Sequence, residues 1–192
     1  MPIDHFAVLG LPRRPWLSSD RLKERFHQLT ASGHPDVGGD AQAFAAINAA
    51  YATLREPAQL LRHFLELEAP EALVGAGASI PPALVDRFME IATLRRATDA
   101  FVKQQSMAIT PLARALLASE RFTLHRDVEN VQAELETLRA RDHESLERED
   151  AGWDARTDEA ISRLAAIQQE LTYLERWSAQ LREALLQLES GA

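Results

Sequence analysis

The sequence predicts an all-α protein. Three observations favour this class: Ala, Leu, Glu, Gln and Arg dominate the composition, β-branched residues are sparse, and no stretch alternates apolar and polar residues for long. Apolar residues instead recur every three or four positions, which is the period of an amphipathic helix. With 192 residues, the chain is long enough for one large domain or two small ones, each with a modest core.

The composition also limits the classes of function. A formal net charge of -8 argues against a general nucleic-acid binder, because neutralising phosphates requires clustered Lys and Arg. The absence of cysteine removes disulfides, thiolate nucleophiles and Cys-based zinc or iron–sulfur ligation, so we expect no metal and no cofactor. No segment approaches the roughly 18 apolar residues of a membrane span, and no signal peptide opens the chain. We therefore expect no membrane association and a cytoplasmic location.

The chain begins with two predicted helices. The first runs from Asp4 to Gly10, which acts as a stop signal. The second has Ser18 or Ser19 as its N-cap and ends near Gly33. Its inward stripe consists of Leu22, Phe26 and Leu29, and the cations outside that stripe are Arg21, Lys23 and Arg25.

A polar turn, GHPDVGGD at 33–40, follows the second helix. Pro35 fixes its own φ and biases His34 towards extended geometry, whereas Gly38 and Gly39 permit backbone angles that other residues resist. We expect a rigid contact loop here, because ordered loops held by a scaffold are where contact residues tend to lie.

Two further helices follow the turn. Asp40 is the predicted N-cap of the third helix, which should pair antiparallel with the second, and Pro57 is the predicted start of the fourth. The apolar residues of the third helix are Phe44, Ile47, Tyr51 and Leu54, and those of the fourth are Leu61, Phe64 and Leu65.

From Glu68 to Ser79 the composition changes to Ala, Gly and Pro with little periodicity, which indicates a linker. We therefore assign residues 1–68 to a first domain, 69–80 to the linker and 81–192 to a second domain. Three long helices joined by short connections predict an antiparallel three-helix bundle in the second domain.

The first helix of this bundle is expected to open at Pro81 and Pro82 and to run to about Phe101 or beyond. Thr110 and Pro111 are a further helix start, and whether residues 112–117 join the next helix stays open. The charged run 139–150 is interpreted as a solvated helix end or loop. Gly152 then breaks the pattern, and the last helix, with leucines at heptad spacing and Ser178 interrupting them, is expected to begin near Trp153.

In order, spacing and flanking helices, the first seventy residues resemble a J-domain, the module through which co-chaperones engage DnaK-type heat-shock ATPases. The resemblance implies that His34, Pro35 and Asp36 contact that chaperone. The cations Arg21, Lys23 and Arg25 are interpreted as a docking face, because exposed charges act mainly on association rate. A solvated surface is the alternative for these three.

A more specific resemblance is to the HscB family, co-chaperones of iron–sulfur cluster assembly that work with HscA-type ATPases. It is carried by INAAYATLREPAQLLRHFLEL at 47–67, by FME at 88–90 and by GWDA at 152–155, together with a carboxy-terminal bundle. It implies that the bundle binds the cluster scaffold protein through Phe88, Met89 and Tyr173, although packing within the bundle is the alternative for each. Acidic positions of the family's client-binding helix are here Thr93, Arg96 and Ala100, which weakens the negative patch.

An enzyme is not expected. The six histidines are scattered, without metal-binding spacing, nucleophile or phosphate-cradling glycine loop. Two alternatives to the scaffold-delivering co-chaperone remain: a J-domain co-chaperone for an unrelated client, and a structural adaptor that self-associates through its last helix. An inactive J-like domain in that adaptor would be consistent with Val37, which replaces the basic residue that commonly follows the aspartate. We expect a monomer or a weak homodimer.

Overall fold

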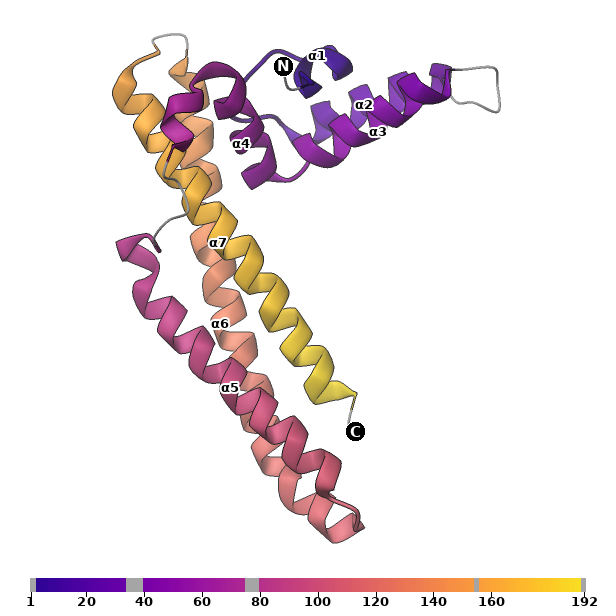
Figure 1. Cartoon of the computed structure of the whole chain (residues 1–192), viewed down its shortest axis with the longest axis vertical. Helices are drawn as coiled ribbons and strands as arrows, with labels where there is room; N and C mark the ends of the chain where they lie inside the picture. Colours follow the sequence, from indigo (N-terminus) through magenta and orange to yellow (C-terminus); the bar gives the residue numbers. More distant parts are fainter. Residues whose placement is uncertain (1–2, 34–39, 75–79, 154–155, 191–192) are drawn as a thin grey trace. The chain divides into compact units, whose positions relative to one another are not determined.

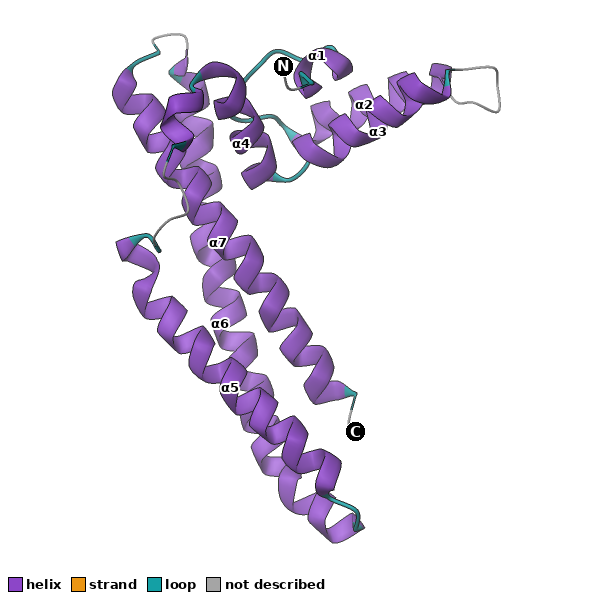
Figure 2. Cartoon of the chain, in the orientation of Figure 1, coloured by secondary structure: helices purple, strands orange, loops and turns teal. Residues whose placement is uncertain are grey.

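The computed structural model describes residues 3–33, 40–74, 80–153 and 156–190, and all regular structure within these ranges is helical (Figure 1, Figure 2). The all-α prediction is therefore confirmed. The helices are α1 His5–Leu9, α2 Ser19–Gly33, α3 Ala41–Leu54, α4 Pro57–Glu68, the 3-10 turns η2 Pro70–Leu73 and η3 Pro82–Leu84, α5 Val85–Met107, α6 Pro111–Ala151 and α7 Asp158–Glu189. Residues 112–117, left open by the sequence, belong to α6.

Hydrogen bonds and backbone geometry at the ends of α1, α3 and α4 confirm the helix starts and stops predicted there. The Asp4 side chain accepts a hydrogen bond from the Ala7 N–H, and Gly10 ends α1 with a left-handed φ of 62°. The Asp40 side chain accepts from the Gln42 N–H at 2.9 Å and so caps α3. Pro57 occupies the first turn of α4, where its missing N–H costs nothing.

The start of the last helix was predicted wrongly. Helix α7 begins at Asp158 and not near Trp153, because Thr157 supplies the cap: its Oγ1 accepts a hydrogen bond from the Ala160 N–H at 3.1 Å. Asp158 and Glu159 then place two carboxylates in the first turn, where the helix dipole favours negative charge.

The chain divides into two compact units. Unit 1 comprises residues 1–78 with 142–171, and unit 2 comprises residues 79–141 with 172–192. Helices α6 and α7 contribute residues to both units. The sequence-based boundaries instead assign all of 142–171 to the second domain; as a division of function those boundaries remain a prediction.

The core of unit 1 joins the four short helices to the segments of α6 and α7 that belong to it. Leu146, Leu164 and Leu171 are buried in one cluster with aromatic and aliphatic residues of the short helices. Those partners include Phe6, Leu9, Leu22, Leu54, Leu61, Phe64 and Leu65. The prediction that residues 139–150 are solvated is therefore wrong at Asp142 and Leu146, which are both buried, because the inward stripe of α6 continues through them.

Unit 2 is a bundle of α5 with the unit 2 segments of α6 and α7, which lie side by side (Figure 1). Two apolar clusters fill it, and both draw on all three helices. The main cluster contains Leu84, Ile91, Val128, Val131, Leu135, Tyr173, Leu174, Trp177, Leu181 and Ala184, and the smaller one Phe101, Leu117, Leu124 and Leu188.

Candidate functional site

The predicted contact tripeptide lies outside the described residues. His34, Pro35 and Asp36 fall between Gly33, the last residue of α2, and Asp40, the cap of α3. Their role as contact residues therefore stays a prediction. The structure does describe α2 and α3, the two helices between which the tripeptide lies in the sequence.

The two helices that flank the loop pack through an aromatic pair. The rings of Phe26 on α2 and Tyr51 on α3 stack with centroids 4.1 Å apart and planes 20° from parallel. Leu22 is buried, and Leu29 and Ile47 pack against the same core. Stacked aromatic pairs stabilise contacts beyond the area they bury, so α2 and α3 form a firm base for the loop.

The three predicted docking cations are not equivalent. Arg21 and Lys23 are exposed. Arg25 is half-buried: its Nε donates to the main-chain carbonyl of Leu9 at 2.7 Å, and its Nη1 donates to Gln28 Oε1 at 3.3 Å. At 100° per residue, Arg21 and Arg25 share one side of α2, whereas Lys23 lies about 160° from both. Arg25 thus ties the end of α1 to α2, a structural task that the sequence pattern did not reveal.

A carboxylate shared by two arginines joins distant parts of unit 1. Glu68, at the end of α4, accepts from Arg13 Nη1 through Oε1 and from Arg156 Nη1 through Oε2, both at 3.0 Å. Arg156 Nη2 also donates to the Glu68 main-chain carbonyl. Arg13 in turn pairs with Asp4 at 2.7 Å, and although burial raises the pKa of Asp4, its bonds to the Ala7 N–H and to Arg13 outweigh that effect and lower it.

Next to this network, Phe64 meets Trp153 edge-on with ring centroids 4.9 Å apart. The Arg156 guanidinium lies over the same Trp153 ring, 5.6 Å from its centroid. Sequence reasoning used Glu68 only as the start of a linker and assigned no role to Arg156. Their separation of 88 positions in the sequence explains why no local pattern could have found the pair.

The predicted client-binding residues lie together in unit 2. Phe88 and Met89 are 38% and 57% exposed, so both reach the surface. Their adjacency on one helix required only that one of them do so. Tyr173 is 8% exposed and packs into the bundle. The ring of Trp177 links them: its centroid lies 6.4 Å from that of Phe88 and 5.5 Å from that of Tyr173.

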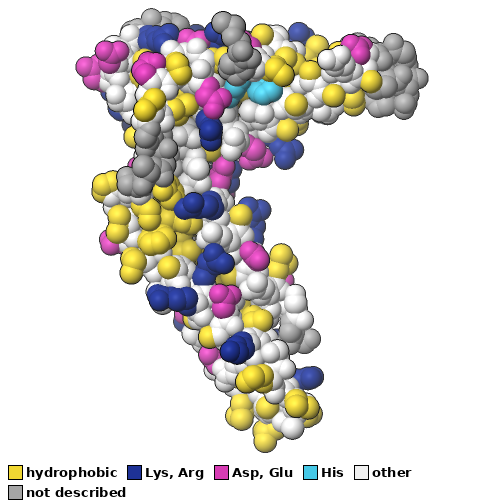
Figure 3. Space-filling view, viewed as in Figure 1, with side chains coloured by type: hydrophobic (Ala, Val, Ile, Leu, Met, Phe, Trp, Pro, Cys, Tyr) yellow, Lys and Arg dark blue, Asp and Glu magenta, His cyan; other side chains and the backbone are white. Residues whose placement is uncertain are grey.

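We call Val85, Phe88 and Met89, together with the Tyr173 and Trp177 rings beneath them, the α5 apolar patch. Figure 3 shows hydrophobic side chains gathered where α5 begins. An exposed apolar cluster of this kind is a feature of binding surfaces, because a monomer otherwise gains by burying it. The patch is therefore a candidate contact surface of unit 2.

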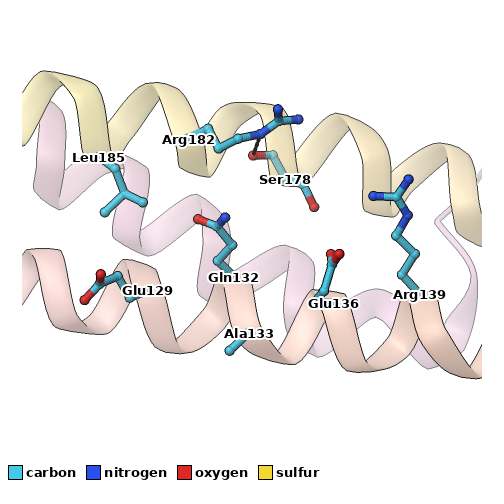
Figure 4. Close-up of a pocket in the computed structure, with 8 residues that line it drawn as sticks. All are labelled: Glu129, Gln132, Ala133, Glu136, Arg139, Ser178, Arg182 and Leu185. Atoms are coloured by element: carbon cyan, nitrogen blue, oxygen red, sulfur yellow. Dashed lines mark hydrogen bonds between the residues drawn. The ribbon is translucent and has the colours of Figure 1, made fainter. Parts of the chain in front are cut away.

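A polar groove of about 630 Å³ runs between the α6 and α7 segments of unit 2. Gln132 and Glu136 of α6 point towards α7, and Ser178, the residue that interrupts the heptad leucines, faces the groove (Figure 4). The Oε1 atom of Gln132 is buried and finds no hydrogen-bond partner in the part of the chain that the structure describes. Arg182 lines the groove and donates to the Ser178 main-chain carbonyl at 3.2 Å.

None of the described helices is long and apolar enough to cross a membrane. Within the described ranges, no cluster of three or more His, Cys, Asp or Glu side chains is arranged to hold a metal ion.

Among solved structures, chaperone HscB from Vibrio cholerae matches this chain with a TM-score of 0.52, over 94% of this chain and 96% of that one. The two sequences are 19% identical over the match. The chain has the HscB fold. The resemblance to HscB noted in the sequence is thus confirmed for the architecture of the chain, an N-terminal J-domain followed by a helical bundle.

Curated relatives match a shorter stretch. Chaperone protein DnaJ 2 from Streptomyces coelicolor and its namesake from Streptomyces avermitilis are each 42% identical over 60 residues, which is 30% of this chain. Chaperone protein dnaJ A6 from Oryza sativa is 36% identical over 53 residues. The chain spans only 12–15% of the length of these DnaJ proteins. No protein-family model matches it.

Within this HscB fold, the sequence found the α5 apolar patch through Phe88, Met89 and Tyr173, but not the part played by Trp177 in joining them. It also found the frame of the tripeptide loop, because caps and apolar spacing are local signals. The contacts of Arg25 and Glu68 were missed, since each depends on chain segments that meet only in the folded unit.

Proposed function

We propose that this protein is a J-domain co-chaperone that stimulates ATP hydrolysis by a DnaK/HscA-type chaperone in the cytoplasm. His34, Pro35 and Asp36 contact the ATPase, with Arg21 and Lys23 steering the encounter. The protein itself is not an enzyme and needs no cofactor. The observation that carries the proposal is the conjunction of an HscB fold over 94% of the chain with a His-Pro-Asp sequence between α2 and α3.

Single-turnover ATP hydrolysis by a purified DnaK-type or HscA-type ATPase tests the proposal. The full-length protein should accelerate hydrolysis, and Asp36→Asn should abolish the acceleration. Asp99→Asn is the matched control, because it neutralises an exposed aspartate of α5 far along the chain from the tripeptide. Equal stimulation by wild type and Asp36→Asn would show that the tripeptide has no such role.

We also propose that the α5 apolar patch binds the client, and that this client is the scaffold protein of iron–sulfur cluster assembly. Support comes from the exposure of Phe88 and Met89 on the rings of Trp177 and Tyr173. Pull-down of the scaffold by the full-length protein should be lost in Phe88→Ala/Met89→Ala. It should persist in Leu112→Ala/Leu116→Ala, which truncates two exposed leucines elsewhere in unit 2. Stimulation of the ATPase without scaffold capture would favour an unrelated client.

The structural-adaptor alternative has less support. It requires an apolar face of the last helix that is free to meet another chain. Five of the heptad leucines of α7 are instead buried within the chain: Leu164, Leu171, Leu174, Leu181 and Leu188. Sedimentation of the full-length protein over a range of concentrations tests this alternative directly.

A further inference from the structure

The electrostatics of the α5 apolar patch point to the chemistry of its client. The whole chain is acidic, with a formal net charge of -8. Unit 2, however, contains eleven Lys and Arg and eleven Asp and Glu residues, so the entire excess of negative charge belongs to unit 1. Because unit 2 has no formal net charge, the electrostatic potential that a partner meets there depends on where its individual charges lie.

Two arginines follow the patch on α5 at heptad spacing. Arg95 is seven residues after Phe88 and Arg96 is seven after Met89, so each lies on the same helix face as its apolar counterpart, about 10 Å along the axis. Arg96 folds back towards the patch: its Nε donates to the Ala92 main-chain carbonyl at 3.2 Å and its Nη2 to Thr93 Oγ1 at 3.4 Å.

A third cation borders the patch from α7. The Arg176 guanidinium lies over the Tyr173 ring, 4.7 Å from its centroid. A guanidinium that stacks on a ring keeps its in-plane N–H donors available, so Arg176 can still bind a carboxylate. Arg95, Arg96 and Arg176 thus border the apolar surface from two helices.

These three cations are available to a carboxylate of a partner. Among the described residues, none of the three forms an ion pair with a carboxylate, and all three are exposed. The nearby carboxylate of Glu90 is already engaged, because Arg87 donates to it at 2.6 Å and also pairs with Glu134. Of the other carboxylates on α5, Asp86 projects from a different side of the helix than Phe88. Asp99 lies within one turn of Arg95 and Arg96, but among the described residues it forms an ion pair with neither.

We propose that the α5 apolar patch selects an acidic, amphipathic partner segment: apolar side chains cover Phe88 and Met89, and flanking Asp or Glu residues pair with Arg95, Arg96 and Arg176. The proposal rests on the client-binding role of this patch and deepens it by naming the chemistry of the segment that binds there. A scaffold segment that binds this patch would be acidic, the reverse of the partner that the family's negative patch implies, because Arg96 stands at one of the acidic positions. Unpaired cations around an apolar centre favour an acidic partner and disfavour a basic one, because like charges brought together at an interface lose affinity.

Fluorescence anisotropy of synthetic peptides titrated with the full-length protein tests the proposal. The probes are three amphipathic helical peptides of equal length with the same apolar face, carrying Glu, Gln or Lys at the flanking positions. Binding should weaken from the Glu peptide through the Gln peptide to the Lys peptide, and the Glu peptide should lose affinity as ionic strength rises.

A charge-reversal pair provides the matched comparison. Arg95→Glu/Arg96→Glu should weaken binding of the Glu peptide by roughly tenfold and improve binding of the Lys peptide. The control Arg121→Glu/Arg182→Glu makes the same change in net charge at a half-buried and an exposed arginine elsewhere on unit 2 and should leave the order of the peptides unchanged. Met89→Ala should weaken all three peptides.

Equal or tighter binding of the Lys peptide to the wild type, or no binding of any peptide, would overturn the inference. Neither result depends on the ATPase. Stimulation of the chaperone without preference for the Glu peptide would reject only the client chemistry. Preference for the Glu peptide without stimulation would reject only the proposed co-chaperone activity.

Discussion

Arg25 donates a hydrogen bond from Nε to the main-chain carbonyl of Leu9 at 2.7 Å. Leu9 is the last residue of α1, so its carbonyl has no partner within the helix, and a charged donor satisfies it. Gly10 makes room for this contact, since a Cβ at that position would lie 2.8 Å from Arg25 Nη2. One side chain of α2 therefore holds the end of α1.

Replacing Arg25 with Gln should destabilise the protein by about 1–2 kcal/mol, because a hydrogen bond from a charged donor is lost and a carbonyl is left unpaired. Arg21→Gln, which removes an exposed cation of the same helix, should change stability by less than about 0.5 kcal/mol. Urea unfolding followed by circular dichroism measures both. Equal stabilities for the two variants would mean that the bond to Leu9 contributes nothing.

Glu68→Gln should lower the stability of unit 1 by about 1 kcal/mol, because Arg13 and Arg156 lose their shared carboxylate. The effect should shrink at high ionic strength, since both arginines are partly exposed and their charges are screened. Glu71→Gln, at an exposed position three residues later, is the control. Thermal unfolding at low and high salt gives the comparison, and a loss independent of salt would point to packing instead.

His63 should make the stability of unit 1 depend on pH. Burial lowers the pKa of His63, with His5 adding to the effect, while Glu66 and Asp4 oppose it. Its Nε2 accepts a hydrogen bond from the His5 main-chain N–H at 3.1 Å, which requires the neutral ring. The folded state thus binds this proton less readily than the unfolded state. The contribution to stability is complete above pH 6.5 and is lost as the pH falls below that value towards the folded-state pKa.

Urea midpoints measured between pH 8 and pH 5 should therefore fall for the wild type and fall less for His63→Gln. His27→Gln, which replaces an exposed histidine of α2, should retain the wild-type dependence. If His63→Gln kept the full pH dependence of the urea midpoint, groups other than His63 would be responsible for that dependence.

Gln132→Leu should stabilise unit 2 by about 1 kcal/mol. The change removes a buried amide oxygen that lacks a hydrogen-bond partner among the described residues, and it adds apolar surface facing α7. Gln104→Leu, at an exposed position of α5, should bring no such gain. Urea titration gives the free energy of unfolding of both variants. A destabilised Gln132→Leu would mean that the amide of Gln132 is satisfied by solvent.

Sequence reasoning was most accurate where the signal was local. Asp4, Gly10, Asp40, Pro57 and Pro111 mark helix ends as predicted, because a cap acts on backbone groups within one turn of itself. It failed where a competing local signal was overlooked, as with Thr157 at the start of α7. It also failed at residues 142–146, where the abundance of charge concealed a continuing inward stripe.

By itself, the sequence determined the all-α class, most helix ends and most of the inward faces of the helices, since these depend on backbone chemistry and on a period of 3.6 residues. Only the tertiary structure decided which core each face joins. Leu171 and Leu174 are neighbours on one heptad stripe of α7, yet Leu171 is buried with Phe6 and Phe64, and Leu174 with Ile91 and Val128. The reason is that periodicity states which side of a helix is apolar, whereas its partner is chosen by segments far away in the chain. Arg25 with Leu9 and Glu68 with Arg156 are likewise pairs that only the fold brings together, so no local pattern predicts them.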